Sequence, residues 1–257
     1  MKKTMLCISA ITLLLLFACS NNDSSTSPTG FPDTNEEGSF DVFDYFISFN
    51  SGVQLFSSSE VNSCIFKLNN IEIDTDWFYD EDEDELFYPG DGWWCLFDLE
   101  ELPEEIDLVH GSEITYYLRI NGKTFSGTIM YPSELEVNWP EFNINEDFIF
   151  SWTLQENTDI QFVNMSVGDY SNSDEQLWEL PNYNRNYTIL ENNFQGYNES
   201  ELWIDVGLYC INYRNHGKCL IISSTHDYFY IYKDKLSPNR LNRKKIILRI
   251  IKEINLK

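Results

Sequence analysis

Residues 114–130, ITYYLRINGKTFSGTIM, carry the clearest indication of local structure in this chain. Two runs rich in β-branched and aromatic residues flank the pair Asn121-Gly122. An Asn-Gly pair suits a type I′ turn, because both central positions of that turn need a positive φ angle. The stretch therefore predicts a β-hairpin that reverses at residues 121–122.

Short apolar and aromatic runs with alternating pattern continue on both sides of this hairpin. On the N-terminal side we expect a broken strand over residues 40–49 and a second strand around Cys64, Phe66 and Leu68. No amphipathic helical pattern occurs between residues 39 and 233. On the C-terminal side five more strands are expected, at FIFSWTL (148–154), DIQFVNMSVGD (159–169), YTILENNF (187–194), ELWIDVGLYCINYR (201–214) and KCLIISSTHDYFYIYK (218–233).

Pro132 follows the hairpin directly and separates two stretches of similar length and style. Many short strands bounded by turn residues are typical of β-sandwiches and barrels. The order of FSW at residues 150–152, followed by a tyrosine-rich closing strand, resembles fibronectin type III and other immunoglobulin-like modules. The predicted fold class is therefore all-β, with two tandem immunoglobulin-like β-sandwiches over residues 39–132 and 133–232. The Cys…Trp…Cys spacing of antibody domains is absent.

The N-terminus, MKKTMLCISAITLLLLFAC, has the layout of a secretory signal: two lysines, then an apolar run too short to span a membrane. Its last four residues, Leu16-Phe17-Ala18-Cys19, resemble the lipobox of bacterial lipoproteins, although Phe17 is bulkier than the usual occupant. That resemblance implies a signal peptide over residues 1–18 and an acylated Cys19 that anchors the mature chain to the lipid bilayer of a bacterial cell envelope. The alternative is an ordinary cleaved signal with an incidental cysteine.

The two ends of the mature chain differ sharply from the body. Residues 19–38 are rich in Ser, Asn, Thr, Pro and Gly, which predicts a lipidated N-terminus followed by a flexible linker. Residues 233–257 form a basic tail in which isoleucines recur at helical spacing. Three interpretations of this tail stay open: a membrane-surface or partner-binding helix, an edge strand or disordered end, and a non-native stretch.

Charge excludes one class of partner. Residues 20–232 hold 40 of the 42 acidic residues and only 6 of the 17 lysines and arginines, a net charge of −34. A body of this charge repels the phosphates of nucleic acid, so nucleic acid is not expected as a partner.

Four cysteines remain once Cys7 leaves with the leader and Cys19 takes lipid: Cys64, Cys95, Cys210 and Cys219. An even number in an oxidising compartment favours disulfides. A reversal centred near residues 214–215 would place Cys210 opposite Cys219, and Cys64 would then pair with Cys95 by elimination. A zinc site is the alternative, but the chain has no Cys-x-x-Cys motif.

The acidic run at residues 80–85 is the one candidate metal loop. Asp80, Asp82 and Asp84 match positions one, three and five of an EF-hand loop. Glu85 then stands where that loop needs glycine, so the EF-hand match fails. We predict no cofactor, with a different kind of Ca²⁺ site or a solvated acidic loop as the two interpretations of this run.

Aromatic residues are dense on both sides of the acidic run. Trp77, Tyr79, Trp93 and Trp94 are the candidate ligand-binding residues, because ring faces beside acids and amides can stack on a sugar. The other interpretation is that they fill the core, which aromatic residues dominate in β-sandwiches.

No catalytic motif is recognisable: the chain lacks GxSxG, HExxH, P-loop and dinucleotide-binding patterns, and its three histidines are isolated in sequence. We therefore expect a non-enzymatic, membrane-anchored lipoprotein that displays β-sandwiches for adhesion, recognition or assembly with another envelope protein. The alternative is a carbohydrate-binding or glycan-degradation accessory protein, with a glycan as partner.

Overall fold

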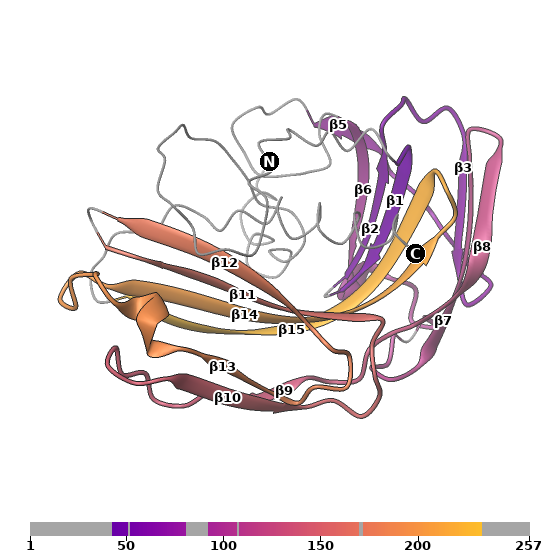
Figure 1. Ribbon diagram of the computed structural model, residues 1–257. Helices are drawn as coiled ribbons and strands as arrows, with labels where there is room; N and C mark the ends of the chain where they lie inside the picture. The colour runs from indigo at the N-terminus through magenta and orange to yellow at the C-terminus, as the bar shows by residue number, and fades with distance from the viewer. Residues whose placement is uncertain (1–42, 51, 81–91, 107, 170–171, 233–257) are drawn as a thin grey trace.

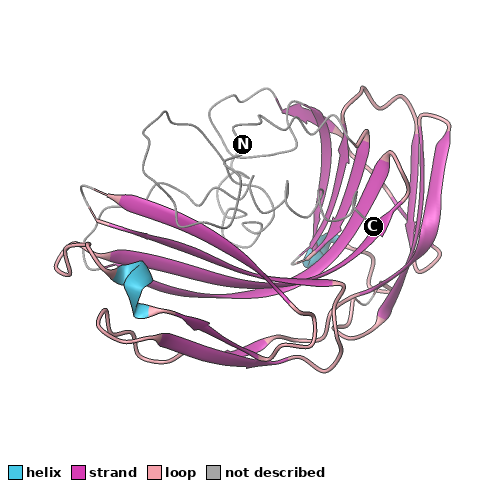
Figure 2. Cartoon of the chain, in the orientation of Figure 1, coloured by secondary structure: helices cyan, strands magenta, loops and turns pink. Residues whose placement is uncertain are grey.

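The computed structural model describes residues 43–50, 52–80, 92–106, 108–169 and 172–232. This part of the chain consists of strands joined by turns and loops, with two short 3-10 helices, so the predicted all-β class is confirmed (Figure 2). Cys19, the signal peptide, the linker and the basic tail lie outside the described residues. In the described part, no helix has the length and apolar character needed to cross a membrane.

The strands fall into three sheets. The largest has the order β12-β11-β14-β15-β1-β2-β6-β5, and two smaller ones have the orders β4-β3-β7-β8 and β13-β10-β9. The strand bounds are β1 (Tyr45–Phe49), β2 (Gly52–Ser57), β3 (Cys64–Leu68), β4 (Ile71–Ile73), β5 (Phe78–Asp80), β6 (Gly92–Asp98), β7 (Glu113–Ile120), β8 (Lys123–Met130), β9 (Glu136–Asn138), β10 (Phe148–Thr153), β11 (Ile160–Gly168), β12 (Ser173–Leu180), β13 (Asn186–Ile189), β14 (Trp203–Asn215) and β15 (Cys219–Tyr232), with 3-10 helices at Leu99–Glu101 and Glu191–Phe194.

The predicted hairpin is confirmed as β7 and β8, whose last pair is Ile120 with Lys123. Asn121 and Gly122 have φ angles of 47° and 79°, as a type I′ turn requires. The Asn121 side chain also accepts a hydrogen bond from the backbone N–H of Asn62 (2.9 Å) and donates one to the carbonyl of Glu60 (2.8 Å). The turn is therefore tied to the loop that precedes β3.

Each smaller sheet packs against a different half of the same face of the large sheet (Figure 1). Strands β3, β7 and β8 cover β1, β2 and β6, and the core between them includes Ile47, Leu55 and Phe66. Strands β9, β10 and β13 cover β11 and β14, and the core between them includes Phe150 and Val206. Each half therefore has two layers of strands, because alternate side chains of each strand point into the core between the sheets.

The large sheet runs without interruption through both predicted domains. Its central contact is a parallel pairing of β1 with the start of β15, in which Tyr45 is opposite Cys219 and Phe49 is opposite Ser223. Cys219 and Ile221, late in the sequence, therefore belong to the core formed by residues 45–131. The prediction of two separate sandwiches is not confirmed, because one sheet serves both.

The opposite face of the large sheet carries a third apolar cluster that spans the two halves. Phe46 and Leu220 are neighbours on adjacent strands at its centre. Its members are Phe43, Phe46, Phe56, Trp94, Ile160, Phe162, Tyr209, Ile211, Leu220 and Ile222. This cluster therefore contains residues of both halves.

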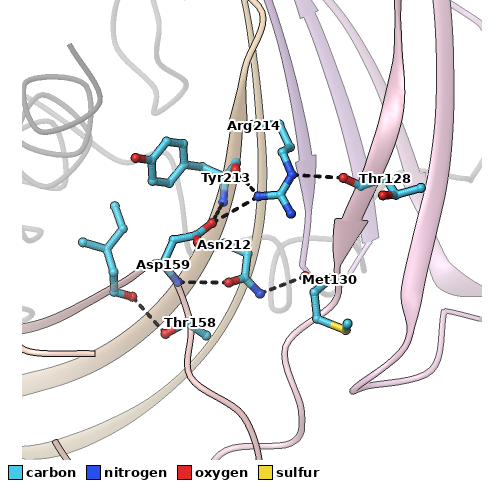
Figure 3. Close-up of polar contacts among 8 residues, drawn as sticks. Thr128, Met130, Thr158, Asp159, Asn212, Tyr213 and Arg214 are labelled. Atoms are coloured by element: carbon cyan, nitrogen blue, oxygen red, sulfur yellow. Dashed lines mark hydrogen bonds and ion pairs between the residues drawn. The ribbon is translucent and has the colours of Figure 1, made fainter. Parts of the chain in front are cut away.

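A polar network fixes the junction between the halves (Figure 3). Asn212, buried in β14, donates to the carbonyl of Met130 (3.0 Å) and accepts from the backbone N–H of Asp159 (3.0 Å). The Asp159 carboxylate accepts from the Tyr213 N–H (2.9 Å) and pairs with Arg214 (3.3 Å). Arg214 also donates to the carbonyl of Thr128 in β8 (3.1 Å). These contacts join β8, β14 and the loop before β11.

Candidate functional site

The candidate site is an aromatic edge formed by Phe78, Tyr79 and Trp93 on β5 and β6. β5 is the terminal strand of the large sheet, and no described strand pairs with its outer side. Phe78 and Tyr79 are 46% and 44% exposed, and Tyr79 contacts the partly buried Trp93 with ring centroids 5.5 Å apart. Exposed aromatic residues together on a sheet edge are a common feature of recognition surfaces.

Strand alternation explains why only part of the predicted aromatic set lies here. Trp94 points to the opposite face of β6 from Trp93, is 1% exposed and packs on Phe56 with ring centroids 4.8 Å apart. Trp77 precedes β5 and packs against the core between β3 and β6. Trp94 is therefore a core residue, Trp77 is half-buried, and Tyr79 and Trp93 remain available to a ligand.

Phe78 belongs to the site, although it is not among the four aromatic residues that the sequence predicts to bind a ligand. The signal was present, since Phe78 and Tyr79 are consecutive and lie just before an acidic run. In an edge strand with one neighbour, both faces can remain open to solvent, so consecutive aromatic residues can both be exposed.

The surroundings of the aromatic edge are acidic. Asp74 and Asp76 are exposed and lie in the segment that leads into β5. Both carboxylates contribute to raising the pKa of the nearby Cys95 thiol, after the larger effect of burial. The aromatic edge therefore combines exposed ring surface with negative charge.

Three of the four cysteines, Cys64, Cys95 and Cys219, lie at the first core, and Cys210 lies in the second. Cys64 in β3 and Cys95 in β6 lie in the same core, between the large sheet and the four-stranded sheet. Cys210 and Cys219 are not opposite each other, because the hairpin turns at residues 216–218 and pairs Cys210 with Thr225. The predicted Cys210–Cys219 bridge is wrong for this reason. All four side chains are thiols in the structure.

The predicted calcium ligands are not described, apart from the backbone of Asp80, which ends β5. Asp82 and Asp84 lie outside the described residues. Within the described ranges no three His, Cys, Asp or Glu side chains gather closely enough to hold a metal ion. The Ca²⁺ interpretation therefore stays a prediction from sequence.

Two histidines make structural contacts. His110 lies 2.8 Å from the carbonyl of Pro132 and stacks on Tyr131. His216, on the turn between β14 and β15, lies 2.6 Å from the hydroxyl of Tyr116. Burial and the nearby Arg214 lower the pKa of His216, which favours its neutral form. Both side chains tie loops to strands.

Comparison with known proteins gives no family for the chain: no family model and no curated protein match it. Similar solved structures include a two-domain fibronectin type III segment of chicken tenascin, with 9% identity over 74% of this chain and 98% of that chain and a TM-score of 0.27. A DUF4785 family protein of Legionella pneumophila shows 8% identity over 73% and 54%, with a TM-score of 0.27. The ectodomain of mouse nectin-like molecule 4 shows 7% identity over 77% and 66%, with a TM-score of 0.20. These TM-scores are all below 0.5, so they carry no argument about function.

Proposed function

We propose that this protein is a non-enzymatic lipoprotein that is anchored to a bacterial envelope membrane through acylated Cys19 and binds another envelope protein. The observation that carries the proposal is the aromatic edge at β5. Phe78 and Tyr79 are adjacent at the end of the large sheet and remain 46% and 44% exposed; of the other large apolar side chains described in that sheet, only Tyr230 is exposed. Exposing aromatic rings to water is unfavourable, and a partner that covers them would remove that cost.

A protein partner fits this edge better than a flat sugar ring does. The rings of Tyr79 and Trp93 are tilted by 56° relative to each other, so they do not form one planar platform for a pyranose. The outer side of β5 offers backbone N–H and C=O groups to which an extended peptide could add as a further strand. A partner segment with basic and apolar side chains would complement the acidic surroundings.

Site-specific photo-crosslinking in the intact envelope tests the partner. A photoreactive phenylalanine analogue at position 79 should give a discrete protein adduct. The same analogue at Tyr183 should give much less, although Tyr183 is 70% exposed and follows β12, the strand at the opposite end of the sheet. No adduct at position 79, or equal adducts at both positions, would contradict the proposal.

A glycan array with the soluble body tests the carbohydrate alternative. We expect no glycan to be bound. Binding that disappears in Tyr79→Ala and Trp93→Ala would replace the protein partner by a glycan. Trp94→Ala is unsuitable for this purpose, because Trp94 is a core residue whose loss would destabilise the fold.

Metabolic labelling of the full chain with palmitate tests the anchor. Wild-type protein should incorporate label, and Cys19→Ala should incorporate none, because Cys19 is the only acceptor that the lipobox resemblance implies. Label retained by Cys19→Ala would refute the anchor while leaving the aromatic edge untouched.

A further inference from the structure

Strands β3 and β6 face each other across the core between the large sheet and the four-stranded sheet. Phe66 of β3 stacks on Phe97 of β6, with ring centroids 6.5 Å apart and an interplanar angle of 18°. Cys64 lies two residues before Phe66, and Cys95 lies two residues before Phe97. Side chains two residues apart share a face of a strand, so both thiols are directed into this same core.

The two thiols also approach the same short segment of chain. The Cys64 thiol interacts with the side chains of Thr75 and Trp77, and the Cys95 thiol with the backbone of Asp76. The Cys64 thiol also contributes to raising the pKa of the Cys95 thiol, after the larger effect of burial. Residues 75–77 are thus a shared neighbour of the two thiols, immediately before the aromatic edge begins at Phe78.

Within the described residues, Cys210 and Cys219 do not pair with each other, and Cys219 does not pair with Cys95. Cys210 is opposite Thr225, six positions along β15 from Cys219, and the two lie in different cores. Cys219 pairs with Tyr45 in β1, which places it three strands from Cys95 in β6. Three inter-strand spacings are about 14 Å, far beyond the Cα separation of about 7 Å that a disulfide tolerates.

We propose that Cys64 and Cys95, which are both thiols in the structure, are oxidised to a single disulfide that joins the two sheets of the first core, and that Cys210 and Cys219 remain thiols. The inference depends only on this packing and not on what the aromatic edge binds. Four cysteines allow three sets of two bridges. The proposal keeps a single bridge, Cys64–Cys95, and no second one.

The oxidant is a protein or small-molecule disulfide. The Cys64 thiolate, after loss of its proton, attacks one sulfur of that oxidant and releases the other as a thiol. The Cys95 thiolate then attacks the Cys64 sulfur and releases the second oxidant thiol. Cys64 and Cys95 lose two electrons and two protons, and the oxidant gains both, so that a disulfide is exchanged for a dithiol.

Accessibility sets the order of these steps. Cys64 is only partly buried, whereas Cys95 is 1% exposed and burial raises its pKa to about 12. Exchange therefore starts at Cys64 and ends at Cys95. Burial also raises the pKa of Cys210 to about 12, so its thiolate is scarce as well, and it lacks a nearby second thiol.

Peptide mapping of the full chain tests the pairing. Protein produced in an oxidising compartment is denatured, alkylated without reductant and digested. The expected result is one crosslinked peptide pair containing Cys64 and Cys95, with Cys210 and Cys219 alkylated. Alkylated Cys64 and Cys95, or a Cys210–Cys219 crosslink, would overturn the proposal.

Variants give a second readout that does not depend on digestion. Wild-type protein should unfold at a higher urea concentration when oxidised than after reduction. Cys64→Ser/Cys95→Ser should unfold at the same concentration in both states, whereas Cys210→Ala should keep the difference. A redox-dependent shift that survives in the double variant would also overturn the proposal.

Discussion

His216 shows how one side chain can connect distant parts of the chain. It lies on the turn between β14 and β15, and its Nε2 atom is 2.6 Å from the hydroxyl of Tyr116 in β7. Burial of the ring and the positive charge of Arg214 both lower the pKa of His216. The neutral ring is therefore favoured in the folded state relative to the unfolded chain.

His216→Gln should reduce the loss of stability on acidification. With a folded pKa below the unfolded value of about 6.5, the unfolded state binds more protons as pH falls through that window, so wild-type stability declines there. Glutamine does not titrate. Urea unfolding at pH 7.5 and pH 5.5 should show a smaller drop in the midpoint for His216→Gln than for wild type.

Tyr116→Phe is the matched control for this effect. It removes the hydroxyl contact but leaves the burial of His216 and the charge of Arg214 in place, so the drop between the two pH values should persist. An equal drop in wild type and His216→Gln would show that His216 does not titrate differently in the two states.

Neighbouring residues in β6 show what sequence can and cannot predict at this scale. Aromatic density beside the acidic run predicted Tyr79 and Trp93 as ligand-binding residues, and their role in binding stays a prediction. Nothing in the local sequence distinguishes Trp93 from Trp94, because both are tryptophans in one strand. Which of the two faces the covered side depends on where Phe56 and the rest of the sheet lie.

Among the elements, the β7–β8 hairpin could be predicted because its information is local. Asn121 and Gly122 have the positive φ angles that this pair adopts readily. The reversal between β14 and β15 was predicted three residues too early. Asn215 remains paired with Leu220, and the positive φ angle falls at Gly217. That register places Cys210 and Cys219 far apart.

Strand β12 could not be predicted from its own residues. Its sequence, SDEQLWEL, is largely polar, and only Leu180 is buried, as suits the terminal strand of a sheet. It pairs with β11 from Ser173 to Leu180, so its neighbour determines its conformation. Periodicity of apolar residues detects strands with a buried face, and β12 has little of one.

Substitutions in the β7–β8 turn should separate two contributions to stability: the positive φ angle at Gly122 and the side-chain hydrogen bonds of Asn121. Gly122→Ala should cost about 1–2 kcal/mol, because its φ of 79° disfavours a Cβ atom even though no atom stands within 4 Å of one. Asn121→Gly keeps the backbone conformation but loses the hydrogen bonds to Glu60 and Asn62, which should cost about 1 kcal/mol.

Chemical denaturation measures the free energy of unfolding of Gly122→Ala and Asn121→Gly relative to wild type. Gly122→Asn is the control, since asparagine tolerates positive φ better than alanine does, and it should be milder than Gly122→Ala. Equal destabilisation by alanine and asparagine at position 122 would contradict the turn assignment.

For the whole molecule, the important contacts are long-range. β1 pairs in parallel with β15, more than 170 residues later, and Asn212 connects β8 to the loop before β11. Sequence patterns contain no information on such pairings, which is why two separate sandwiches were expected. The buried residues of the first core come from residues 45–131 together with Cys219 and Ile221, and those of the second core come from residues 148–210.

This architecture predicts one cooperative unfolding unit. Removing either half would expose the third apolar cluster and leave β1 without its β15 partner. Neither half should therefore unfold while the other stays folded.

Differential scanning calorimetry of residues 39–232 tests this claim most directly. A single transition whose calorimetric enthalpy equals its van't Hoff enthalpy is the predicted result. Two resolved transitions, or a calorimetric enthalpy about twice the van't Hoff value, would contradict the account and restore two independent sandwiches.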